Sequence, residues 1–130
     1  MAEMSNFLEN ALLNATLNAT TYTAPATVYV SLWTSDPTDA GSGTEVSTSG
    51  TGYARTAVSF ATASGTSGTG YARTAVSFAT ASWGTVGWIG INDAATSGNL
   101  LYHTALDTAK AIDSGDIFKI STGNLSVTLA

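Results

Sequence analysis

The chain has 130 residues, which is enough for one domain with a single hydrophobic core. Only 10% of the residues are charged, four basic against nine acidic, and the formal net charge is -5 at pH 7. This balance argues against binding to nucleic acid or to an anionic membrane, because both need a basic surface. Cysteine is absent, which excludes disulfides and thiolate metal sites. The sequence shows neither a membrane-spanning apolar run nor a secretion signal, so we expect a soluble, unprocessed chain.

The first predicted element is a helix from Ser5 to Leu17, in the sequence SNFLENALLNATL. Ser5 or Asn6 can cap its N-terminus, and Asn6 followed three residues later by Glu9 resembles a capping box. Its apolar stripe is narrow, and a short helix of this kind is marginal alone. We therefore expect it to dock on its own sheet or on a neighbouring subunit. The candidates for subunit docking are Phe7, Leu8, Leu12 and Leu13.

The clearest strand is TVYVSLW, from Thr27 to Trp33, and we expect it to be central in its sheet. A long surface loop of turn-forming residues follows it, from Ser35 to Gly52. A metal site could be imagined from the acidic residues of this loop, Asp36, Asp39 and Glu45. Their spacing does not match a calcium loop, so we expect solvated carboxylates instead.

A sixteen-residue segment, SGTGYARTAVSFATAS, occurs twice, at Ser49 to Ser64 and at Ser67 to Ser82. Solenoid repeats drift in sequence and need several copies to bury a core, so two identical copies do not indicate a solenoid. The repeat is a recent duplication, an artefact of cloning or a misassigned sequence, and a functional tandem motif with matched cations at Arg55 and Arg73 is the least favoured interpretation. Each copy predicts one strand, and each supplies one of the two arginines of the chain, Arg55 and Arg73. We expect each arginine to support a local carboxylate.

The segment from Trp83 to Leu106 predicts a β-hairpin and holds the densest cluster of large apolar residues. Its strands run from Val86 to Ile91 and from Leu100 to Leu106, joined by a loop of small residues. Two more strands are predicted at the C-terminal end. They lie near Ile117 to Ser121 and near Leu125 to Leu129.

These patterns together predict a mainly β protein with one N-terminal α-helix. About six to eight short strands separated by turn signals favour an antiparallel β-sandwich of jelly-roll or immunoglobulin-like type. We expect residues 1–22 to form the helix and an arm, and residues 23–130 to form the β-sandwich domain.

Nothing in the sequence supports catalysis. The only histidine, His103, shares a predicted strand face with Leu101 and Ala105, which favours a hydrogen-bonded structural role over a catalytic base. The aspartates that could form a glycosidase pair lie in or beside turns, where aspartate caps backbone amides. They are Asp93, Asp107, Asp113 and Asp116. The glycines of GTGYAR do not form a phosphate-binding loop, because no lysine and no helix follow them.

Carbohydrate binding is a stronger alternative, because exposed aromatic rings stack on sugars. The candidate rings are Tyr22, Trp33, Trp83, Trp88 and Tyr102. In a chain with few leucines and isoleucines, however, we expect Trp83 and Trp88 to lie in the core.

Two strings of the sequence resemble a family of small virion proteins of tailed phages. They are LWTSDPTDAGSGTEV from Leu32 and WGTVGWIGINDA from Trp83. Members of this family are encoded among head and tail genes and are often labelled tail fibre or structural proteins. The resemblance covers nearly the whole chain and departs at the second repeat copy, where AVSFATASW, from Ala75 to Trp83, replaces a longer run.

The resemblance implies a non-enzymatic virion protein without a cofactor. We predict an outer capsid decoration, or cement, protein that binds the major capsid protein and copies of itself in a homotrimer. The alternative is a tail or tail-fibre module that contributes to host attachment through a carbohydrate receptor. The surface-contact candidates are Trp33, Arg55 and Arg73.

Overall fold

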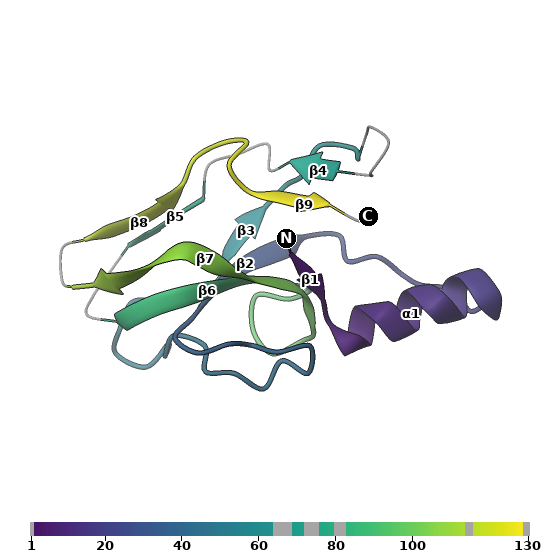
Figure 1. Ribbon diagram of the computed structural model, residues 1–130, viewed down its shortest axis with the longest axis horizontal. Coiled ribbons are helices and arrows are strands. Elements are labelled where there is room, and N and C mark those ends of the chain that lie inside the picture. The colour runs from purple at the N-terminus through teal and green to yellow at the C-terminus, as the bar shows by residue number, and fades with distance from the viewer. Residues whose placement is uncertain (1, 64–68, 72–75, 80–82, 114–115, 129–130) are drawn as a thin grey trace.

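The structure is a computed structural model that describes residues 2–63, 69–71, 76–79, 83–113 and 116–128. These residues form one helix, a five-stranded antiparallel sheet and two two-stranded ribbons (Figure 1). The helix is α1 (Asn6–Leu17). In spatial order the sheet contains β1 (Glu3–Met4), β7 (Leu100–Ile112), β6 (Gly84–Asn92), β2 (Val28–Trp33) and β3 (Thr56–Val58). The ribbons pair β4 (Thr69–Tyr71) with β9 (Ser126–Thr128) and β5 (Val76–Ala79) with β8 (Ile117–Ile120).

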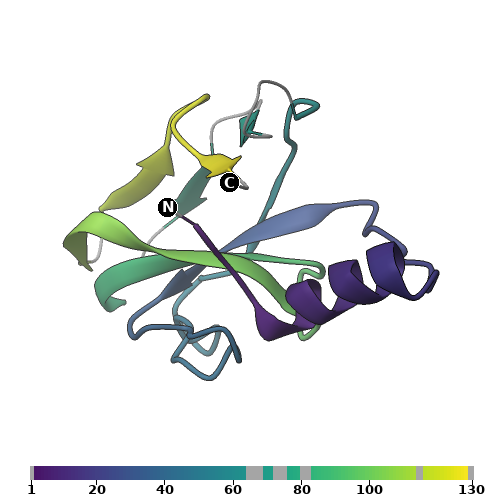
Figure 2. The same cartoon turned by 45° about the vertical axis from the view of Figure 1, so that its right-hand side comes forward.

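The mainly β class with one N-terminal helix is confirmed. The two ribbons lie over one side of the five-stranded sheet (Figures 1 and 2). Phe118 of β8 and Leu125, just before β9, belong to the same apolar cluster as Leu32 of β2. The described strands do not join the ribbons into a second continuous sheet. The jelly-roll or immunoglobulin-like sandwich therefore stays a prediction.

The core lies between this side of the sheet and the ribbons. It contains Val30, Leu32, Val46, Tyr53, Val58, Trp83, Val86, Ile89, Ile112, Phe118 and Leu125. Alternation along β2 directs its valines and leucine to this side. The register between β6 and β7 shifts after Val86: Val86 lies opposite Lys110, whereas Trp88 lies opposite Ala105. Val86 and Ile89, on either side of this irregularity, both belong to the core.

The predicted hairpin is confirmed as β6 and β7, and β7 extends six residues beyond the predicted end, to Ile112. The predicted strand from Thr27 is confirmed as β2, which lies between β6 and β3 inside the sheet. Near the C-terminus, β8 and β9 also match the two predicted strands.

The predicted helix is confirmed, but its capping differs from the capping box that begins at Asn6. Ser5 is the N-cap, and its hydroxyl oxygen accepts a hydrogen bond from the backbone N–H of Leu8 at 3.3 Å. Glu9 is then one position too far along the helix for a capping box. Within the described ranges, no helix has the length and apolar character needed to cross a lipid bilayer.

The two identical repeat copies fold differently. The first copy forms β3, which pairs with β2 in the five-stranded sheet. The second copy is predicted to form one strand, and its described residues lie in two: β4, which pairs with β9, and β5, which pairs with β8. The partner strands and not the local sequence alone therefore decide where each copy extends.

Candidate functional site

The side of the sheet opposite the core carries an unusual row of polar residues. Across neighbouring strands, Glu3 of β1 lies opposite His103 of β7, and His103 lies opposite Gly90 of β6. Gly90 in turn lies opposite Ser31 of β2. Residues directly opposite each other point to the same side of a sheet, so this row forms one continuous polar strip. We call it the polar face.

At the centre of the polar face, three side chains form a buried hydrogen-bond network. The indole Nε1 of Trp33 donates to the hydroxyl of Ser31 at 2.8 Å, and this hydroxyl donates to Asn92 Oδ1 at 2.6 Å. A Cβ atom at Gly90 would lie 2.7 Å from Ser31 Oγ and 2.9 Å from Trp33 Nε1. Glycine is therefore required there, because any side chain would displace the network.

Beside this network, Arg55 and Glu45 form a bidentate ion pair. Arg55 donates from Nε to Glu45 Oε1 at 2.8 Å and from Nη2 to Oε2 at 2.7 Å. Its Nη1 also donates to the carbonyl oxygens of Ala94 and Ser97 in the β6–β7 loop, at 3.0 and 2.7 Å. The hydrogen bonds to Glu45 raise the pKa of the Arg55 guanidinium above its usual value. Arg55 thus ties two loops together, and its predicted role of supporting a local carboxylate is confirmed.

Tyr53 extends this cluster into the core. Its hydroxyl donates to Glu45 Oε1 at 2.7 Å and accepts from the backbone N–H of Leu32 at 3.0 Å. Burial raises the pKa of this hydroxyl far above its usual value, and the Glu45 carboxylate raises it further, while the Leu32 N–H acts in the opposite direction. The ring meets Trp83 edge-to-face, with 5.4 Å between the ring centroids.

A pocket of about 230 Å³ opens where the polar face meets the start of α1. Its walls come from the helix start, the loop after β2 and the β6–β7 loop. The lining includes Phe7, Trp33, Asp39, Arg55, Asn92 and Asn99.

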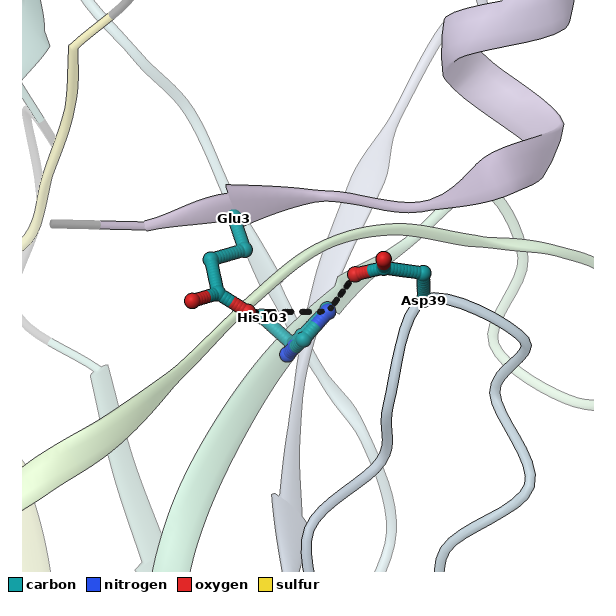
Figure 3. Close-up of side chains that lie close together, drawn as sticks. All are labelled: Glu3, Asp39 and His103. Carbon is teal, nitrogen blue, oxygen red and sulfur yellow. Dashed lines mark hydrogen bonds and ion pairs between the residues drawn. The ribbon is translucent and has the colours of Figure 1, made fainter.

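His103 of the polar face lies close to three carboxylates, of which Figure 3 shows Glu3 and Asp39. The residue is 4% exposed, and its Nε2 lies 3.0 Å from Asp39 Oδ1. Glu3 Oε2 lies 3.9 Å from the same nitrogen, and Asp36 Oδ1 lies 4.0 Å from Nδ1. Within the described part of the chain, no serine hydroxyl is a hydrogen-bond partner of His103. The predicted hydrogen-bonded structural histidine is confirmed, and no catalytic triad forms around it.

The four helix residues predicted to dock a subunit point in different directions. Leu8 is 4% exposed and packs within its own chain, and Phe7 lines the 230 Å³ pocket. Leu12 and Leu13 line a separate open hollow of about 420 Å³, together with Met4, Glu9 and Thr16. Leu13 and Leu17 are 55% and 75% exposed, and their spacing of four residues places them on one side of the helix. We call this side the leucine face.

The three residues predicted to make surface contacts differ in what the structure shows of them. Trp33 is 5% exposed, because its ring packs over Gly90 and its indole N–H is used within the network. The guanidinium of Arg55 is occupied by Glu45 and the β6–β7 loop. Arg73 lies outside the described residues. Trp83 is buried as predicted, whereas Trp88 is only partly buried.

Residues 3–128 match the protein family described as Podophage GP4 fiber I protein gp80. The chain belongs to this family. It is a phage tail fibre protein and so a structural component of the virion, in a family that is not enzymatic. A comparison with curated proteins finds no match.

The family match bears directly on the predicted function. A virion structural protein without enzymatic activity is confirmed. The capsid decoration role is not supported, and the match favours the alternative, a tail-fibre module. The capsid decoration role was predicted from the low charge of the chain and from a helix that needs a partner. Both features suit any subunit that is buried between neighbours. Those features do not distinguish head from tail.

Proposed function

We propose that this chain is a fibre subunit that assembles by packing the leucine face of α1 against another copy of itself. The supporting observation is that Leu13 and Leu17 are mostly exposed although they are among the largest apolar side chains of α1. Burying one such side chain contributes about 1.5 to 3 kcal/mol relative to leaving it exposed. A subunit contact on this face would recover that free energy.

The hollow beside the leucine face supports the same proposal. It is lined by Met4, Leu12 and Leu13, with the polar Glu9 and Thr16 completing its wall. An apolar depression next to protruding leucines can receive the leucines of a neighbour, which is the geometry of a self-complementary or cyclic interface. A homotrimer is one cyclic arrangement that meets this requirement.

Sugar recognition is not part of this proposal. The rings of Trp33 and Trp83 are 5% and 7% exposed, so neither offers an open stacking surface. Tyr22, Trp88 and Tyr102 are partly buried, and the proposal places no role on them.

The test compares oligomers of the wild type with those of the Leu13→Ser/Leu17→Ser variant by native mass spectrometry and sedimentation. The matched control is Ile117→Ser, because Ile117 of β8 is 74% exposed and lies away from α1. We expect the helix variant to be monomeric and the control to keep the wild-type oligomer. An oligomer that survives the helix variant would contradict the proposed interface.

The position in the particle needs a second measurement. We expect few copies of the chain per virion, with density located at the tail. A copy number similar to that of the major capsid protein would contradict the fibre assignment and would restore the decoration role.

A further inference from the structure

We propose that Glu3, Asp39 and His103 form a binding site for a divalent first-row transition-metal ion, with zinc as the best-fitting ion. The imidazole Nε2 lies 3.0 Å from Asp39 Oδ1 and 3.9 Å from Glu3 Oε2. The three donor atoms all lie within 4.8 Å of one another. Zinc binds such ligands at about 2.0 to 2.2 Å, and tetrahedral geometry then separates neighbouring donor atoms by about 3.3 to 3.6 Å. Movements of a few tenths of an ångström in the exposed Glu3 and Asp39 side chains therefore bring three donors to one ion.

The electrostatics of the cluster favour a cation. Glu3, Asp36 and Asp39 all lie within 4.0 Å of the His103 ring, and among described residues this ring is the ion-pair partner of each. One imidazole cannot neutralise three carboxylates, even when it is protonated. A divalent ion between the donors would offset their mutual repulsion.

The donor types distinguish between ions. One imidazole nitrogen with two carboxylates suits zinc and its transition-metal neighbours, whereas calcium and magnesium prefer oxygen ligands alone. The His103 side chain is 3% exposed and is held in place before any ion binds. The side chains of Glu3 and Asp39 are 72% and 52% exposed, so an ion can enter and keep water in its remaining positions.

Asp36 completes the arrangement from the other side of the ring. Its Oδ1 lies 4.0 Å from His103 Nδ1, which is too long for a direct hydrogen bond. When Nε2 binds an ion, the imidazole proton resides on Nδ1 and faces this carboxylate. If Asp36 moves to hydrogen-bond distance, its carboxylate would accept this proton and orient the metal-bound histidine.

The three ligands come from separate segments, and this gives the site a structural role. Glu3 belongs to β1, Asp39 to the loop after β2, and His103 to β7. These segments meet at the base of α1, where the backbone N–H of Asn6 donates to the carbonyl of Asp39 at 2.9 Å. A bound ion would cross-link the helix base to the sheet. This inference does not depend on subunit assembly, because it concerns a single chain.

The test uses the full chain, stripped with EDTA and titrated with zinc by calorimetry, with thermal unfolding measured in parallel. We expect one zinc ion per chain and a Tm that rises with zinc concentration, because the ion binds the folded state. Glu3→Gln and Asp39→Asn should each weaken binding by at least roughly tenfold, and His103→Gln should abolish it. Asp107→Asn, an exposed carboxylate on the same strand as His103, is the control and should bind zinc like the wild type.

Two further readouts keep the test decisive. If His103→Gln does not fold, the exposed Glu3 and Asp39 variants decide the result, because their side chains leave the core intact. Cobalt substitution should give visible absorption bands that are lost in the same variants. Absence of zinc binding, or equal affinity in the wild type and both carboxylate variants, would overturn the site and indicate an adventitious ion only. Calcium or magnesium affinity equal to that of zinc would overturn the assignment of the ion.

Discussion

The two faces of the five-stranded sheet use the same strands but different interactions. The core face is closed by aliphatic and aromatic side chains such as Val30, Leu32 and Ile89. The polar face is closed by directional bonds, among them the Arg55–Glu45 pair and the network around Ser31. Apolar burial is non-directional and tolerates small shifts, whereas buried polar groups must keep their partners. The core face should therefore carry most of the stability, and the polar face should fix the positions of the loops.

The largest expected effect is on the core face. Leu32→Ala removes a side chain that is 0% exposed at the centre of the sheet. We expect the free energy of unfolding to fall by about 3 to 5 kcal/mol, because the lost transfer energy and the new cavity add. Urea denaturation measures this change. A loss below about 1 kcal/mol would mean that the core face is not the main source of stability.

The ion pair on the polar face should come next. Glu45→Met leaves the Arg55 cation, whose side chain is 11% exposed, without its partner. We expect a loss of about 2 to 3 kcal/mol, slightly below the range for fully buried pairs. The double variant Glu45→Met/Arg55→Met should lose less than the single variant, because no charge then remains unpaired. Additive losses in this double-mutant cycle would show that the two side chains do not act as a pair.

A smaller effect is expected at Gly90, which tests how tightly the polar face is packed. Gly90→Ala places a Cβ 2.7 Å from Ser31 Oγ and 2.8 Å from Leu100 Cδ1. We expect a loss of about 1 to 2 kcal/mol from the forced rearrangement. Gly87→Ala on the same strand is the matched control, because among the described residues its Cβ would meet only Ala109 Cβ, at an ordinary 3.8 Å. Equal thermal stability of the two variants would contradict the close packing.

The smallest expected effect on the free energy of unfolding comes from Tyr53 at alkaline pH. This residue bonds the Glu45 carboxylate and also belongs to the core. Burial raises the pKa of this hydroxyl in the folded chain, so the stabilising contribution is complete below pH 10 and decreases as pH rises. Above pH 10 we expect the free energy of unfolding to fall by about 1.4 kcal/mol per pH unit for this group. Tyr53→Phe should show a shallower decline in denaturation measured between pH 9 and about pH 11. Parallel declines would assign the effect to other tyrosines, such as Tyr102, whose pKa burial also raises.

The local elements of the fold could be predicted because their signals are local. A serine cap at Ser5, alternation in β2 and turn residues between β6 and β7 each act over a few positions. The repeat shows the limit of this reasoning. One sixteen-residue sequence pairs with β2 in its first copy and with β8 and β9 in its second, so long-range context overrides local preference.

The polar clusters were largely beyond prediction for the same reason. Asp39 and His103 are 64 residues apart, and no spacing rule connects a loop aspartate with a strand histidine. Arg55 was expected to support a nearby carboxylate, but its bonds to the carbonyls of Ala94 and Ser97 carry no sequence signal. Leu13 is among the predicted docking residues and Leu17 is not, and only the structure separates these two exposed leucines from the buried Leu8.

The attachment of α1 has a mechanical consequence. The helix is fastened at its first turn, where Ser5 bonds the β7 backbone and Leu8 is buried, while Leu17 is 75% exposed at the far end (Figure 1). The helix has 12 residues and is therefore roughly 18 Å long. A tilt of about 10° at the first turn would move the C-terminal end of the helix by about 3 Å. Slight bending at this turn would let the helix tip meet neighbours at varied spacing while the five-stranded sheet keeps its position.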